Sequence, residues 1–200
     1  MEFDGTRVEN IGLRRKGNSS ATRSASTNVN YIPLKVDINK YVDSQKFKGL
    51  SKFNLHIAST SSGGSGIEDY LGYGVYREFK YPSPRTGWAE VWLNGEFVGL
   101  YTIVEQLDAQ FLKRWFDKTD GNLYKPESPA GTLEWRGTSF DSYTNANWDR
   151  GEDTNHTAFL HAVNVINNKD VAAFGEAMDV DGVLTYLAGN IAIGAWDNYT

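Results

Sequence analysis

The sequence predicts an α+β fold in which strands come first and helices follow. Apolar residues alternate with polar ones over Thr6–Arg14, Tyr31–Asp37 and Phe53–Ala58, as they do in half-buried strands. Asn94 and Gly95 separate two further apolar runs, and this pair favours a β-hairpin because both turn residues adopt positive φ. Apolar residues in the second half instead recur at helical spacing, so we expect helices after the sheet.

The expected helices follow from spacing and from end signals. Ile67–Lys80 has apolar residues four apart and stops before Pro82, which is typical of an amphipathic helix. Asp108 precedes Ala109–Phe116 in the position of a helix N-cap. Three later segments also have helical patterns, namely Thr157–Asn167, Val171–Met178 and Val180–Gly194. The last of these is the most apolar stretch of the chain, which predicts a buried helix.

Composition excludes several functions. The 200 residues carry a net charge of −5, whereas a nucleic-acid-binding surface needs a basic face, so we expect no nucleic-acid partner. The absence of cysteine excludes disulfides, thiolate metal sites and cysteine nucleophiles. No apolar run approaches the roughly 20 residues of a membrane span. The polar start of the chain is not typical of a signal peptide.

Two short motifs have the chemistry of a phosphate site. In the loop from Arg14 to Ser20, Gly17 lets backbone N–H groups approach a ligand while cations and hydroxyl groups surround it. The spacing is not that of a Walker loop, and an ordinary polar turn is the alternative. Alternation places Lys35 on the strand face opposite to Leu34 and Val36. This lysine is either solvated or directed into a ligand cleft.

Four stretches in one order resemble the CotH kinase family of atypical kinases similar to spore coat protein H. They are LRRKGNSS at 13–20, YIPLKVDINKY at 31–41, VWLNGEFVGLYTIVEQLD at 91–108 and GNLYK at 121–125. The resemblance implies an atypical protein-kinase-like, two-lobed fold. Residues 1–106 would form the small lobe, and residues 107–200 the helical part of a large lobe that is incomplete in this chain.

The resemblance also implies an activity, namely ATP-dependent phosphoryl transfer to Ser or Thr hydroxyls of a protein substrate, with Mg²⁺ or Mn²⁺. It implies a location outside the cell or on the cell or spore surface. The alternative function is a non-catalytic CotH-like surface module that binds a protein or glycan partner. A carbohydrate-binding β module that uses the many Trp and Tyr residues is a weaker third option, because the second half has helical patterns.

Site residues follow from the matching positions. The nucleotide-binding residues implied are Arg15, Gly17, Asn18, Ser19, Ser20, Lys35, Glu105, Gln106, Leu107 and Lys125. Lys35 would contact the α- and β-phosphates, and the backbone of the hinge at 105–107 would read adenine. Glu105 would tie the hinge to the small lobe or contact the ribose. Asp197 would be the catalytic carboxylate that orients the acceptor hydroxyl and takes its proton.

The chain departs from the family pattern in three places. Lys16 replaces an arginine before the glycine, which keeps the charge but loses the bidentate fork. An Asp and an Arg that usually mark the start of the helix near residues 59–68 are missing, with Glu68 where the Arg would fall. The metal-binding positions would lie beyond Thr200, so we expect a fragment. The histidines lack metal spacing and a paired nucleophile, and we expect surface or satisfied core positions for them.

Overall fold

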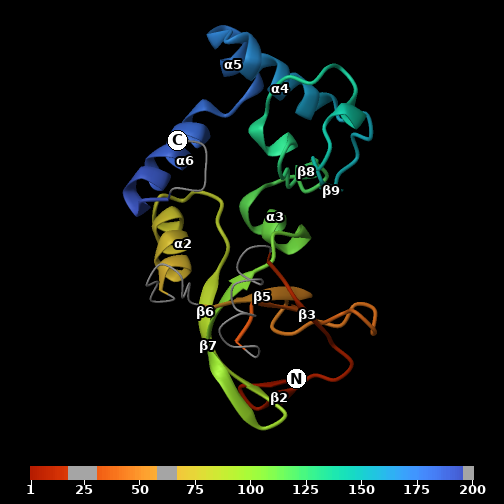
Figure 1. Ribbon diagram of the computed structural model, residues 1–200, viewed down its shortest axis with the longest axis vertical. Coiled ribbons are helices and arrows are strands. Elements are labelled where there is room, and N and C mark those ends of the chain that lie inside the picture. The colour runs from red at the N-terminus through yellow and green to blue at the C-terminus, as the bar shows by residue number, and fades with distance from the viewer. Residues whose placement is uncertain (18–30, 58–66, 196–200) are drawn as a thin grey trace. The chain divides into compact units, whose positions relative to one another are not determined.

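The computed structural model describes residues 1–17, 31–57 and 67–195, and the chain divides into two compact units, Met1–Trp115 and Phe116–Thr200 (Figure 1). The described part of the chain contains both helices and antiparallel sheets, which confirms the mixed α and β composition expected from sequence.

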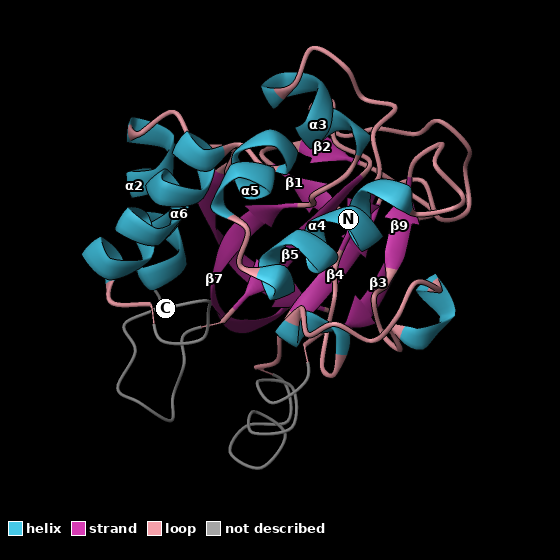
Figure 2. Cartoon of the chain, turned by 90° about the horizontal axis from the view of Figure 1, so that it is seen from above, coloured by secondary structure: helices cyan, strands magenta, loops and turns pink. Residues whose placement is uncertain are grey.

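The first unit is built on a five-stranded antiparallel sheet with the strand order β3-β4-β5-β7-β6. Figure 2 shows β3, β4, β5 and β7 in this order. Its strands are β3 (Gly12–Arg15), β4 (Leu34–Asp37), β5 (Lys52–His56), β6 (Thr86–Leu93) and β7 (Glu96–Glu105). A separate hairpin pairs β1 (Glu2–Phe3) with β2 (Thr6–Arg7). The prediction of one strand over Thr6–Arg14 is therefore wrong. Asn10 has a φ of 53°, which interrupts the extended backbone between β2 and β3.

One face of this sheet is apolar and forms the core of the unit. The buried residues of this core are Leu34, Val36, Ile38, Phe47, Phe53, Leu55 and Tyr101. Leu34 pairs with Leu55 across the strands, and Leu55 pairs with Ile103, so their side chains share one face. The alternation predicted in β4 is confirmed, because Leu34 and Val36 are buried and Lys35 between them is only partly buried.

The hairpin of β6 and β7 turns at Asn94 and Gly95, as predicted, with φ values of 53° and 86°. The register of the hairpin shifts near the turn, because Val91 pairs with Gly99 whereas Trp92 pairs with Phe97, and this shift marks a bulge. Gly99 lies beside this bulge with a φ of 154°, and a Cβ added to it would lie 2.5 Å from Cε2 of Tyr31. The tyrosine ring therefore occupies the space that a side chain at position 99 would need.

We expect Gly99→Ala to lower the free energy of unfolding by about 1–3 kcal/mol, because the new methyl group meets a ring and the backbone adopts a φ that suits glycine. Urea denaturation measures this effect. Gly87→Ala on the facing strand is the matched control, since nothing lies within 4 Å of its added Cβ. Equal transition midpoints for the two variants would show that the tyrosine ring yields without cost.

The helix α2 (Glu68–Glu78) lies where a helix was expected and ends before Pro82. It packs against β6 (Figure 1). The ring centroids of Tyr70 in α2 and Trp88 in β6 are 5.4 Å apart. Asp69 is in the first turn of this helix. The carboxylate of Asp69 is thereby held beside the sheet.

The helix α3 (Ala109–Trp115) also follows the prediction, including its cap. Asp108 accepts a hydrogen bond from the backbone N–H of Gln110 at 2.8 Å. The indole N–H of Trp115 donates to the carbonyl of Ser83 at 3.2 Å, which joins the helix to the first unit. The first compact unit ends at Trp115, the last residue of α3. The boundary between two lobes after residue 106 stays a prediction.

The second unit contains a short two-stranded sheet and three helices in its described part. The elements are β8 (Leu123–Tyr124), β9 (Trp148–Arg150), α4 (Thr157–Asn168), α5 (Val171–Ala177) and α6 (Val180–Ile193), with short 3₁₀ turns at Ala130–Thr132 and Phe140–Ser142. Its core gathers around Tyr143, Phe159 and Val163. The histidine at the start of α4, His156, is buried and bonds the Tyr124 hydroxyl at 2.9 Å, a satisfied core position as expected.

The helix α6 forms as predicted, but its predicted burial is wrong. Leu184 and Ile191 are both exposed. They lie seven residues apart, which is two helical turns, so they share one face of the helix. Apolar residues occur around the whole helix, and this face remains in solvent. No helix in the described part of the chain is long and apolar enough to cross a membrane.

Candidate functional site

The second face of the five-stranded sheet carries polar side chains. In the strand register Arg14 pairs with Lys35, and Lys35 pairs with Asn54. Paired residues project to the same side of a sheet, so these three side chains form a row across β3, β4 and β5. His56 lies two residues after Asn54 in β5 and therefore projects from the same face.

The row leads to the end of β7, where the hinge was expected. The side-chain amide of Asn54 donates to Oε1 of Gln106 and to the carbonyl of Val104, both at 3.4 Å. Asn54 is buried, whereas Leu107 is exposed. Two of the predicted regions, the lysine strand and the hinge, are therefore joined through one asparagine that the sequence analysis did not identify.

Glu105 ends β7 and is almost fully buried, with 2% of its side-chain surface exposed. Its carboxylate accepts two hydrogen bonds from the guanidinium of Arg114, at 2.6 and 2.5 Å. The side chain and the backbone N–H of Arg85 each donate a further bond at 3.0 Å. The carboxylate thus ties β7 to α3 and to the residue before β6.

These contacts set the ionisation of Glu105. Burial by itself raises the pKa of the carboxyl, but the hydrogen bonds from Arg114 and Arg85 outweigh burial and hold the pKa below its usual value. Glu105 is therefore a buried anion at neutral pH whose charge is balanced by two arginines.

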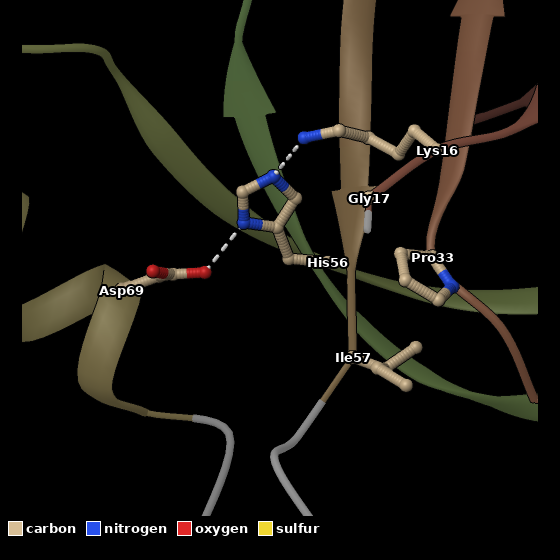
Figure 3. A pocket seen from close by; sticks show the side chains of 6 residues that line it. All are labelled: Lys16, Gly17, Pro33, His56, Ile57 and Asp69. Carbon is tan, nitrogen blue, oxygen red and sulfur yellow. Dashed lines mark hydrogen bonds and ion pairs between the residues drawn. The ribbon is translucent and has the colours of Figure 1, made fainter. Parts of the chain in front are cut away.

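The turn after β3 lies at the edge of the polar face. Gly17 has a φ of 85°, and the backbone N–H of Lys16 donates to the carbonyl of Pro33 at 3.0 Å. A pocket of about 200 Å³ lies at this turn (Figure 3). It is lined by Lys16, Gly17, Pro33, His56, Ile57 and Asp69.

Three side chains in this pocket form a continuous chain of hydrogen bonds (Figure 3). Lys16 Nζ lies 2.7 Å from His56 Nε2, and His56 Nδ1 lies 2.6 Å from Asp69 Oδ2. An ammonium group only donates, so Nε2 is the acceptor, and the ring proton is on Nδ1 and is donated to the carboxylate. Burial, together with the charge of Asp69, raises the pKa of the neighbouring Tyr73 to about 12.

The register separates some of the predicted nucleotide-binding residues. Arg15 pairs with Leu34 and lies on the opposite face from Lys35, whereas Arg14 lies beside the lysine. Lys125 is in the second unit, where it is exposed and lies 3.4 Å from Glu127. The remaining predicted site residues, Asn18, Ser19, Ser20 and Asp197, lie outside the described part of the chain.

Sequence reasoning did not identify Asn54, His56 and Asp69 as site residues. His56 and Asp69 belong to different elements and have no motif spacing, so only the folded chain brings them together. One signal in the sequence could have linked two of these residues. Side chains two residues apart in a strand project from the same face, so Asn54 and His56 had to share a face of β5. Within residues 1–17, 31–57 and 67–195, no group of three or more His, Asp or Glu side chains could hold a metal ion.

The model of the CotH kinase protein family matches residues 13–200, which include the turn at Gly17, the polar row and the hinge. No curated protein matches the chain.

Proposed function

The chain belongs to the CotH kinase protein family, and from this premise we propose that it transfers the γ-phosphoryl group of ATP to a Ser or Thr hydroxyl of a protein, with Mg²⁺ or Mn²⁺. Membership in this family by itself indicates a kinase-like function. The nucleotide, the metal and the acceptor are the parts that we propose. Among the described residues, no group of three or more His, Asp or Glu side chains could hold a metal ion. We therefore propose roles only for residues of the chain and none for a metal ligand.

The observation that carries the proposal is the row of polar side chains across the sheet. It brings Lys35 into register with Asn54, which bonds the hinge residue Gln106. A nucleotide lying along this face would place its base at the hinge and its phosphates near Lys35, the arrangement in which kinases hold ATP. In this binding mode the lysine ammonium offsets phosphate charge, and Asn54 fixes the hinge relative to the lysine strand.

In the proposed transfer step, Asp197 is the general base. Its carboxylate would orient the acceptor hydroxyl and take its proton as the new oxygen–phosphorus bond forms. The bond between the γ-phosphorus and the bridging oxygen breaks, and ADP leaves. Lys35 remains bound to the phosphates that stay on the nucleotide.

We expect Lys35→Ala to weaken ATP binding by about 1–3 kcal/mol, the range for a hydrogen bond to a charged group. Thermal stability should change little, because Lys35 is on the polar face and not in the core. Isothermal titration calorimetry measures the affinity. Lys48→Ala removes an exposed lysine of the same unit and is the matched control. Unaltered ATP affinity in Lys35→Ala would refute this placement of the nucleotide.

A non-catalytic surface module is the second candidate, and the hairpin of β6 and β7 favours it. Trp92 and Phe97 are exposed there with ring centroids 5.2 Å apart. Exposed aromatic pairs are common in surfaces that bind proteins or glycans. A location outside the cell or on the cell or spore surface belongs to both proposals, and fractionation of the source cells with an antibody to the chain tests it.

A further inference from the structure

We infer that His56 and Asp69 are positioning residues that hold Lys16 at the Gly17 turn for the phosphate groups of the nucleotide. The inference rests on the proposed function and extends it to three side chains in one pocket (Figure 3). Lys16 directly follows β3, His56 is the last residue of β5, and Asp69 is in the first turn of α2.

The geometry fixes the role of each group. The Lys16 ammonium donates to His56 Nε2 at 2.7 Å, and His56 Nδ1–H donates to Asp69 Oδ2 at 2.6 Å. Asp69 thereby holds both the tautomer and the orientation of the ring, as carboxylates do for metal-binding histidines. The neutral ring separates the lysine from the carboxylate, so the cation is held in place without forming a direct ion pair with Asp69.

A positioned lysine binds an anion better than a free one. A lysine side chain has much rotamer entropy, and part of this entropy is lost when a ligand immobilises the side chain. The bond to His56 restricts the side chain before a ligand arrives. The pocket of about 200 Å³ is also more than ten times the roughly 10–15 Å³ that one water needs on the same measure of volume, so it has room for a phosphate group.

The test measures the affinity for ATP and for adenosine, in the presence of Mg²⁺, of a protein that continues past Thr200 and so includes the expected metal-binding positions. His56→Leu removes the acceptor, and we expect ATP binding to weaken about tenfold, as for loss of one bond to a charged group. His56→Gln should retain most of the affinity, because its side-chain oxygen can accept from Lys16. Asp69→Ala should weaken ATP binding about threefold. Adenosine has no phosphate, and its affinity should not change.

A double variant separates positioning from a structural role. If His56 acts through Lys16, then His56→Leu should have no further effect on ATP affinity in a Lys16→Met background. The matched controls are Lys48→Met, Asp4→Ala and His161→Gln, which change exposed residues. A loss that persists in the Lys16→Met background, or that extends to adenosine, would show a structural role and overturn the inference.

Two further outcomes separate this inference from the proposed function. If Lys16→Met binds ATP as tightly as the wild type while Lys35→Ala does not, the inference is wrong and the proposed function stands. If the wild type binds no ATP at all, both are wrong.

Discussion

Arg114→Met is expected to lower the free energy of unfolding by about 2–3 kcal/mol. It removes two of the hydrogen bonds to the buried carboxylate of Glu105 and leaves that charge with Arg85 alone. Breaking a buried ion pair typically costs about 3–5 kcal/mol, and the remaining arginine reduces the loss here. The guanidinium of Arg114 also lies 5.5 Å from the ring centroid of Phe111 and 5.9 Å from that of Trp115, so methionine removes these cation–π contacts together with the ion pair.

The stability lost in Arg114→Met should depend on pH, because folding lowers the pKa of Glu105. A carboxyl whose pKa is lowered by folding stabilises the protein above its unfolded pKa of about 4.3, and that stabilisation is lost as pH falls through the folded value. The difference in stability between wild type and Arg114→Met should therefore be greatest at neutral pH and shrink in acid. Denaturant unfolding at a series of pH values measures it.

The control for this variant is Arg7→Met, which breaks an exposed pair with Glu9 and should change stability by less than about 1 kcal/mol. Adding Glu105→Gln to Arg114→Met removes the buried charge and should recover part of the loss. A constant difference between wild type and Arg114→Met across the pH series would mean that packing, and not charge, sets the effect.

In a protein that continues past Thr200 and so includes the expected metal-binding positions, Asp197→Asn is expected to reduce the rate of phosphoryl transfer by about 10²–10⁴-fold, the usual contribution of a general base, with ATP affinity unchanged. The amide cannot take the proton of the acceptor hydroxyl, and the residue has no proposed contact with the nucleotide. Transfer of radiolabelled phosphate to a basic protein substrate or to the chain itself measures the rate. Asp181→Asn, an exposed position in α6, is the matched control.

This variant also separates the two proposed functions. A wild-type protein that binds ATP and transfers phosphate only while Asp197 is present is a kinase. If the wild type binds ATP but transfers nothing to any protein, the surface-module proposal takes its place, and the exposed pair Trp92 and Phe97 becomes the first target for mutagenesis.

The elements that could be predicted from the sequence are those with local signals. Asn94 and Gly95 predict the hairpin because few other residues adopt positive φ at a tight turn. Asp108 predicts the start of α3 because an N-cap side chain bonds backbone N–H groups within the next three residues. The break at Asn10 and the exposed face of α6 depend on what surrounds them. Local patterns of hydrophobicity do not contain that information.

The candidate site was predictable only in part, for the same reason. Parity within one strand placed Lys35 opposite to the buried residues Leu34 and Val36. Which of Arg14 and Arg15 lies on the same face as Lys35 could be decided only from the register of β3 against β4. The contact between His56 and Asp69 joins a strand to a helix across an intervening stretch of chain, and no spacing rule anticipates it.

The contact between Gly99 and Tyr31 has a consequence for how this chain can evolve. The ring of Tyr31 fills the space beside Gly99, and its hydroxyl donates to the carbonyl of Leu100 at 2.8 Å. A larger residue at position 99 therefore requires a smaller one at position 31, and the smaller one gives up the bond to Leu100. Substitutions at positions 31 and 99 are therefore coupled. We expect related sequences either to have both the glycine and the aromatic residue or to have neither.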